Sequence, residues 1–220
     1  MRPLLSALPA LLLTACGMLP AWPEALTPTL PQALVPAFLD PVPVAEPDPP
    51  GMVATQDGDA TPSLRLSWAK GQALALLIQA NGENRLWRSA GGVVVATDGA
   101  RVVATAGLRE WIASTRLDGP DPLDEPLALV GRSTGLRRQV DLVRGDRAPE
   151  TMRFGVALTC RLGAAYEGAA VVVRESCRGG GTGGFTNRYW ADPGSGGIYR
   201  SEQWVGEAGL MRVEVVTPPS

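Results

Sequence analysis

Two glycine-flanked motifs in the sequence have the residue types of known active sites. Residues 131–135, Gly-Arg-Ser-Thr-Gly, fit the G-x-S-x-G pattern, in which a serine attacks an acyl carbon after a histidine has taken its proton. The chain has no histidine, so Ser133 lacks that base. Residues 179–184 fit the dinucleotide pattern G-x-G-x-x-G, which must open a helix. The aromatic and polar residues that follow are typical of a strand, so neither motif predicts catalysis or a bound nucleotide.

Four acidic side chains gather in the proline-rich residues 117–126, and paired carboxylates act as acid and base in most glycoside hydrolases. Their spacing does not fit a calcium loop, in which oxygen ligands alternate around a glycine. Without histidine the usual zinc ligand is also missing. We therefore expect a solvated acidic loop, with no metal and no cofactor, and a carboxylate-based glycan hydrolase stays as an alternative. The four residues are Asp118, Asp121, Asp124 and Glu125.

The first cysteine closes a secretion signal. An apolar run over residues 4–13 follows Arg2 and is too short to cross a bilayer, which takes about 20 helical residues. A basic start, a short apolar centre and a small-residue exit are typical of a secretory signal peptide. The exit, Leu13-Thr14-Ala15-Cys16, resembles the lipobox of bacterial lipoproteins, in which the cysteine carries lipid. We expect a signal peptide over 1–15 and a lipid anchor on Cys16; an ordinary signal peptide with an incidental cysteine is the alternative.

The remaining cysteines, Cys160 and Cys177, form an even pair once Cys16 carries lipid. Outside the cytoplasm a disulfide is the default for such a pair. Residues 152–160 alternate between apolar and other side chains, which turns Cys160 toward a core. A hairpin between this strand and the next would bring the two cysteines together, so we expect a disulfide between them.

Proline divides the mature chain into two parts. Residues 17–62 hold 11 of the 20 prolines, which favours an extended tether over 16–62. A four-residue apolar repeat inside it (Leu26, Leu30, Leu34, Phe38) leaves open that part of this segment packs against a domain. We expect that domain to cover residues 63–220.

Short β-type runs separated by turn signals predict an all-β domain, an antiparallel β-sandwich or open barrel of about ten short strands. Residues 107–115 are expected to hold one short helix that carries Trp111. The expected strands are 64–68, 73–78, 85–88, 92–97, 101–106, 152–160, 169–176, 186–191, 197–205 and 210–216.

The last hairpin of this domain, residues 187–205, mixes aromatic and polar side chains on both faces of both arms. That mixture is not a core pattern, and aromatic rings with a hydrogen-bonding edge suit protein interfaces and sugar faces. The alternative is that Trp190 and Trp204 belong to the core, because tryptophan is mostly buried. The surface predicted to meet a partner or a glycan consists of Tyr189, Trp190, Tyr199, Arg200, Gln203 and Trp204.

The charges nearly balance, with 20 basic and 22 acidic side chains. Removal of Arg2 with the signal peptide leaves 19 basic against 22 acidic side chains, a net charge of −3. No basic cluster stands out in the sequence, so nothing predicts a nucleic-acid partner.

Three segments carry a family resemblance. They are Thr105-Ala106-Gly107-Leu108, residues 187–192 (Asn-Arg-Tyr-Trp-Ala-Asp) and residues 201–206 (Ser-Glu-Gln-Trp-Val-Gly). Together with the lipobox and the cysteine pair, they make the chain resemble the YjbF family of lipoproteins, also called the group 4 capsule lipoprotein family. The resemblance covers roughly residues 64–216.

The resemblance implies a cell-envelope lipoprotein encoded with exopolysaccharide or capsule genes, held at the outer membrane and facing the periplasm. It implies a non-enzymatic role in polysaccharide assembly or export. Its expected partners are the membrane, the polysaccharide, a periplasmic polysaccharide-export protein and an outer-membrane β-barrel protein. No catalytic residue carries over. A glycan hydrolase and a purely structural envelope lipoprotein are the alternatives.

Overall fold

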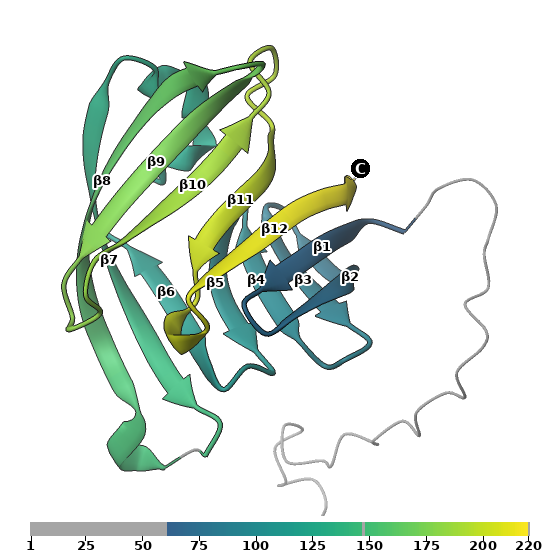
Figure 1. The fold of residues 1–220 in the computed structure, drawn as a ribbon, viewed down its shortest axis with the longest axis vertical. Coiled ribbons are helices and arrows are strands. Elements are labelled where there is room, and N and C mark those ends of the chain that lie inside the picture. Colours follow the sequence, from purple (N-terminus) through teal and green to yellow (C-terminus); the bar gives the residue numbers. More distant parts are fainter. Residues whose placement is uncertain (1–60, 147, 220) are drawn as a thin grey trace, which may run out of the picture. The chain divides into compact units, whose positions relative to one another are not determined.

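The computed structural model describes residues 61–146 and 148–219 (Figure 1). The expected signal peptide, the lipid anchor at Cys16 and nearly all of the expected tether lie outside these residues. No helix in the described part has the length and hydropathy needed to span a membrane.

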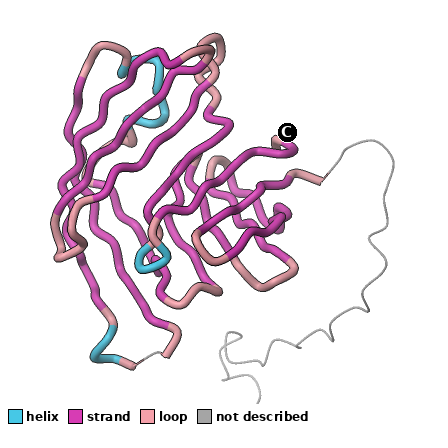
Figure 2. Tube along the Cα trace, viewed as in Figure 1, coloured by secondary structure: helices cyan, strands magenta, loops and turns pink. Residues whose placement is uncertain are grey.

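The regular elements of the described residues are twelve strands and four short 3₁₀ segments, joined by turns and loops. Figure 2 shows that strands dominate the trace. The 3₁₀ segments are η3 (Pro122–Asp124), η4 (Pro126–Leu129), η5 (Pro149–Thr151) and η6 (Gly206–Ala208). The strands are β1 (Ser63–Trp68), β2 (Gly71–Asn81), β3 (Asn84–Ser89), β4 (Val94–Asp98), β5 (Arg101–Ala106), β6 (Glu110–Leu117), β7 (Ser133–Arg144), β8 (Arg153–Glu167), β9 (Ala170–Arg178), β10 (Phe185–Ala191), β11 (Ile198–Trp204) and β12 (Leu210–Thr217).

All twelve strands belong to one antiparallel sheet in the order β5-β4-β3-β2-β1-β12-β11-β10-β9-β8-β7-β6. Strand β12 pairs with β1, so the two ends of the domain join in the middle of the sheet and leave β5 and β6 at its edges. The sheet curls until it is nearly closed, and β1–β5 lie opposite β7–β10 (Figure 1). The all-β prediction is confirmed, and of its two forms the open barrel is the observed one.

The two edge strands meet at Gly107, where the chain turns from β5 into β6. Gly107 has a φ of +79°, and a Cβ there would lie 2.5 Å from the Gly92 carbonyl oxygen, so only glycine fits. Beyond the turn, the Ile112 amide donates a 3.1 Å hydrogen bond to the Thr105 hydroxyl. A side chain thus links the edges near the point where the chain turns.

The predicted count of about ten strands missed β6 and β7. The short helix expected over residues 107–115 is wrong, because Glu110 and Ile112 alternate inward on β6, which pairs with β7. On β7 the inward positions are Leu136, Arg138, Val140 and Leu142. A buried arginine among them hides the apolar alternation by which strands are recognised.

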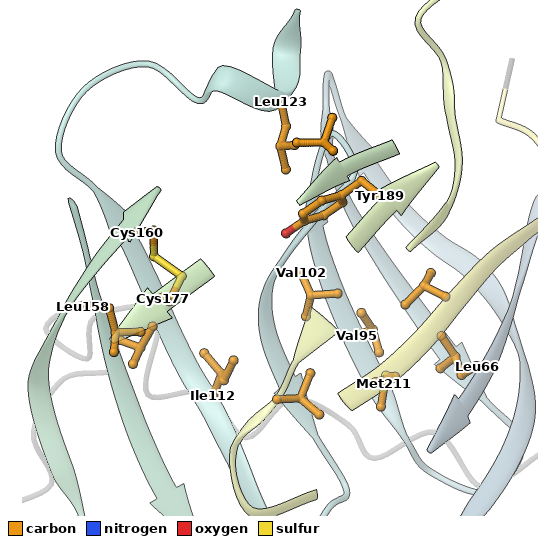
Figure 3. Close-up of a cluster of buried hydrophobic side chains, with 14 of the residues drawn as sticks. Leu66, Val95, Val102, Ile112, Leu123, Leu158, Cys160, Cys177, Tyr189 and Met211 are labelled. Atoms are coloured by element: carbon orange, nitrogen blue, oxygen red, sulfur yellow. A yellow bond between two sulfur atoms is a disulfide. The ribbon is translucent and has the colours of Figure 1, made fainter. Parts of the chain in front are cut away.

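The curled sheet has two opposite walls, and the inward-facing side chains of both walls fill the space between them. Figure 3 shows Leu66, Val95 and Met211 on one side of this core and Leu158 on the other. Cys160 and Cys177 lie directly opposite each other on β8 and β9, with Cα atoms 4.0 Å apart, and form the expected disulfide. That prediction is confirmed.

Candidate functional site

A cluster of charged side chains lies inside the apolar core. Arg101, the first residue of β5, is completely buried and makes two ion pairs. Its Nη1 lies 3.0 Å and 3.1 Å from the two carboxylate oxygens of Glu175 on β9. Its Nη2 donates a 2.9 Å hydrogen bond to Asp121, which precedes η3. One guanidinium therefore connects an edge strand, the opposite wall of the sheet and the acidic loop.

Neutral polar groups complete this interior charged cluster. The Asn187 amide donates a 2.7 Å hydrogen bond to Glu175. The Tyr189 hydroxyl lies 3.2 Å from both Glu175 Oε2 and Gln203 Oε1. Gln203 accepts a hydrogen bond from the Val102 amide and donates one to the Ala100 carbonyl, at 2.9 Å and 2.8 Å. Side chains of β10 and β11 thus satisfy both the buried carboxylate and the backbone of β5.

Arg138 of β7 is the second buried cation of the cluster. Only 3% of its surface is exposed, and its Nε and Nη2 have no hydrogen-bond partner among the described residues. Its guanidinium lies 5.7 Å from the centre of the Phe185 ring, a cation–π contact. Burial lowers the pKa of Arg138, while the charge of Glu175 opposes that effect.

Burial and neighbouring charges shift the pKa values of Glu175 and Tyr189 in the cluster. Burial alone would raise the pKa of the Glu175 carboxyl, but the charges of Arg101 and Arg138 outweigh it and hold that pKa below its usual value. Burial, with the nearby Glu175 charge, raises the pKa of the Tyr189 phenol well above its usual value. The paired carboxylate and the phenol belong to one hydrogen-bonded network inside the sheet.

The cluster does not form a metal site. Ligand atoms of Glu175, Cys160 and Cys177 lie within 4.8 Å of one another. Both sulfurs are bonded to each other, however, so no thiolate is free to bind a metal.

A cavity of about 720 Å³ opens beside the cluster, a size typical of small-ligand pockets. Tyr199 provides aromatic surface, Trp87 lies buried behind it, and the Arg85 guanidinium lies 3.3 Å from the Glu83 carboxylate. Partial burial, and then repulsion from Asp121 and Asp98, raise the pKa of the Asp124 carboxyl above its usual value. We call this the β3–β11 cavity; the lining residues used below are Glu83, Arg85, Trp87, Asp124 and Tyr199.

The structure divides the six residues that the sequence predicted as one surface. Tyr189 and Gln203 are 0% and 2% exposed, so these two are not surface residues. Their hydrogen-bonding edges find partners in the interior charged cluster, which is why polar side chains are stable there. Trp204 is half-buried, and its ring stacks on Phe185 with centroids 4.6 Å apart.

The other three predicted residues are less buried and lie on two faces of the sheet. Trp190 and Arg200 face each other across β10 and β11, with the guanidinium 4.0 Å from the ring centre. Tyr199 is 45% exposed, points to the opposite face of β11 from Arg200 and lines the β3–β11 cavity. Trp190, Tyr199 and Arg200 are therefore the part of the predicted surface that remains accessible.

Sequence reasoning missed most of the charged residues of the cluster. Glu175 stands at an inward position of β9, between Val173 and Cys177, and this alternation was a usable signal. Asp121 was expected in a solvated loop; instead it binds Arg101, and its side chain accepts a hydrogen bond from the Leu123 amide at the start of η3. No local sequence pattern marks Arg101 as a buried residue, because its partners Asp121 and Glu175 lie far away in the chain.

Residues 53–216 match the family model described as group 4 capsule polysaccharide lipoprotein (GfcB, YjbF). The chain belongs to the YjbF family. The resemblance expected from the sequence is confirmed, over nearly the same residues. Membership of the YjbF family relates the chain to capsule polysaccharide and, as a lipoprotein family, to the cell envelope.

Among solved structures, the chain is similar to the hypothetical lipoprotein YmcC from Escherichia coli (K12). The TM-score is 0.59 at 17% identity, covering 73% of this chain and 85% of that one. At this identity the likeness is one of fold. A search of curated proteins found no match.

Proposed function

We propose that this YjbF-family protein is anchored by lipid on Cys16 in the outer membrane, faces the periplasm, and acts without catalysis in exopolysaccharide or capsule assembly or export. The family match over residues 53–216 carries the proposal. The Leu-Thr-Ala-Cys exit of the apolar amino-terminal run supports the anchor. The partners we propose are the polysaccharide, a periplasmic polysaccharide-export protein and an outer-membrane β-barrel protein.

The β3–β11 cavity supports a binding role. Its exposed Tyr199 and its charged side chains, Arg85 among them, are of the kinds that hold sugar rings and their polar substituents, and the buried Trp87 lies behind them. Trp87 is itself fixed, because its ring nitrogen donates a 3.2 Å hydrogen bond to Thr97. A rigid aromatic wall lowers the entropy lost on binding.

One observation favours the alternative of a carboxylate-based glycan hydrolase. Asp124, whose pKa is raised, shares the cavity with Glu83. A glycosidase acid has a raised pKa, and a second carboxylate serves as nucleophile or base. If the protein were such an enzyme, removal of either carboxylate would abolish its function.

Deletion of the gene, followed by complementation, separates these possibilities. We expect deletion to stop the appearance of polysaccharide at the cell surface, and the wild-type gene to restore it. Under the proposed function, Asp124→Asn and Glu83→Gln also restore secretion, whereas failure of both variants, with normal protein levels, would support the hydrolase. A deletion strain that secretes normally would contradict the proposed function, and a weakened envelope in that strain would favour a purely structural role.

A further inference from the structure

The outer face of four neighbouring strands carries a concentration of arginines that the sequence scatters over some 50 positions. Arg137 on β7 lies opposite Thr159 on β8, which lies opposite Arg178 on β9. Arg174 on β9 lies opposite Arg188 on β10. Together with Arg161 on β8, these exposed arginines (Arg137, Arg161, Arg174, Arg178 and Arg188) form what we call the arginine face.

Sheet geometry sets the spacing of these arginines. Neighbouring strands lie about 4.8 Å apart, and residues on the same face of a strand are about 6.8 Å apart. Each arginine of the face therefore has another within about 5–8 Å between Cα atoms. Strands β7–β10 lie side by side in Figure 1, so the side chains share one continuous surface.

Most of these arginines lack the acidic partner that several other outward arginines have. On β1 and β12, Arg65 and Arg212 pair with Glu214 and Glu202. In the described part of the chain, no carboxylate lies within 4.0 Å of the guanidinium nitrogens of four arginines of the face; Arg174 alone is paired, with Glu167. The four are Arg137, Arg161, Arg178 and Arg188.

Unpaired positive charge is thus concentrated on one face of a protein whose net charge is −2. Like charges held this close repel one another, and an anionic ligand relieves that repulsion. The arrangement is the electrostatic complement of a polyanion.

The disulfide holds the centre of this face in place. Arg161 and Arg178 each follow a cysteine of the Cys160–Cys177 pair, whose side chains point into the core. The bridge therefore fixes the two strands directly beneath these arginines. A surface that is ordered before binding loses less entropy when a ligand arrives.

The side chains between the arginines suit a sugar. Thr159, Ser176 and Thr186 stand among them, and the Ser176 and Thr186 hydroxyls lie 3.1 Å apart. A hollow of about 660 Å³ adjoins the face, where Arg137 and Thr159 line it together with Arg116 and Asp118. Guanidinium groups bind carboxylates through two parallel hydrogen bonds, and hydroxyls exchange hydrogen bonds with sugar hydroxyls.

A lipid surface fits this face less well. Membrane-binding surfaces combine positive charge with exposed apolar side chains that enter the headgroup region. The exposed apolar residues of β8 are Phe154 and Tyr166, near the two ends of that strand and away from the arginines. The side chains among the arginines are hydroxyls.

We propose that the arginine face binds a linear acidic polysaccharide, with the sugar carboxylates lying across the guanidinium groups. The proposal rests on the capsule-related function above and names the chemical class of its glycan. It predicts that binding depends on the unpaired arginines and weakens steeply as salt is raised.

The test uses the full lipoprotein held in phosphatidylcholine nanodiscs, with polygalacturonate as the acidic probe and dextran as the neutral one. We expect binding to polygalacturonate and none to dextran. Arg161→Gln/Arg178→Gln should weaken polygalacturonate binding by about tenfold or more. The matched control, Arg65→Gln/Arg212→Gln, removes the same charge from the same sheet and should change the affinity less than about twofold.

Thermal unfolding checks that each variant folds. A second pair of substitutions on the face, Arg137→Gln/Arg188→Gln, should weaken polygalacturonate binding in the same way. Equal loss in the control pair, or no binding of polygalacturonate, would overturn the proposal. Capture of empty phosphatidylglycerol nanodiscs without polygalacturonate binding would make the face a membrane-binding surface and would also overturn it. These results leave the proposed function standing, because that function fails only if the deletion strain secretes normally.

Discussion

Arg101 on β5 and Glu175 on β9 form an ion pair across the interior of the sheet, although 74 residues separate them in the chain. β5 is an edge strand and β9 lies in the opposite wall, so the pair joins parts of the sheet that share no backbone ladder. Both side chains are completely buried. The ion pair is therefore a support of the nearly closed sheet rather than a surface contact.

Removal of one partner of this pair should be costly. Glu175→Gln leaves Arg101 and Arg138 without their shared counter-charge, and loss of one buried partner typically costs about 3–5 kcal/mol. Replacing both partners, in Arg101→Met/Glu175→Leu, should recover only part of that loss, because the charge of Arg101 is removed with its partner while Arg138 still lacks its counter-charge. Urea unfolding of the wild type and the two variants measures the effect, and a loss below about 1 kcal/mol for Glu175→Gln would contradict it.

The same carboxylate should make the protein sensitive to acid. The pKa of Glu175 in the folded state lies below its ordinary value of 4.5, so the unfolded chain takes up this proton first. Its contribution is complete above pH 4.5 and is lost as the pH falls through the folded-state pKa. Thermal unfolding at descending pH should show a smaller decline in Glu175→Gln than in the wild type; equal declines would contradict this.

The disulfide should be a main source of stability. Cys160 and Cys177 are 17 residues apart, which corresponds to about 3 kcal/mol of loop-closure entropy in the unfolded chain. Reduction, or Cys160→Ala/Cys177→Ala, should lower the free energy of unfolding by about that amount. Thiol labelling of the unfolded, unreduced protein should find neither cysteine free, and two labelled thiols among these positions would refute the bridge.

Two residues of β11 on opposite faces of the sheet should respond differently to substitution. Gln203→Ala leaves the Val102 amide and the Ala100 carbonyl without their buried partner, at a cost of about 1–3 kcal/mol. Arg200→Ala removes a cation–π contact with Trp190, worth about 0.5–1 kcal/mol. Melting temperatures compare the two. A Gln203→Ala protein as stable as Arg200→Ala would mean that the interior charged cluster does not hold β5.

Lipidation of Cys16 remains a prediction of the sequence. Cys16→Ala should leave an unprocessed precursor that takes up no labelled fatty acid, because the modified thiol is missing. Membrane fractionation and fatty-acid labelling of cells carrying the variant measure this. Normal processing with unchanged membrane retention would show that the signal peptide is an ordinary one.

Local patterns in the sequence predicted the all-β class, the strand that carries Cys160 and the cysteine pair. These features are local because alternation and turn residues act over a few positions. The prediction failed at β6 and β7, where Glu110 and Arg138 occupy inward positions. A charged residue at a core position looks like a solvent-facing one until its partner is known.

Only the tertiary structure decided which polar residues are interior and which are exposed. Tyr189 and Trp190 are adjacent in sequence, yet the first lies in the interior charged cluster and the second packs on Arg200. The arginine face likewise exists only because strand register sets Arg137, Arg161 and Arg178 side by side. The sequence determined the strands and their two faces, because side-chain alternation is a property of the backbone. The partners of Arg101, which lie 20 and 74 residues away, depend on how the sheet pairs and curls, and no local pattern encodes that.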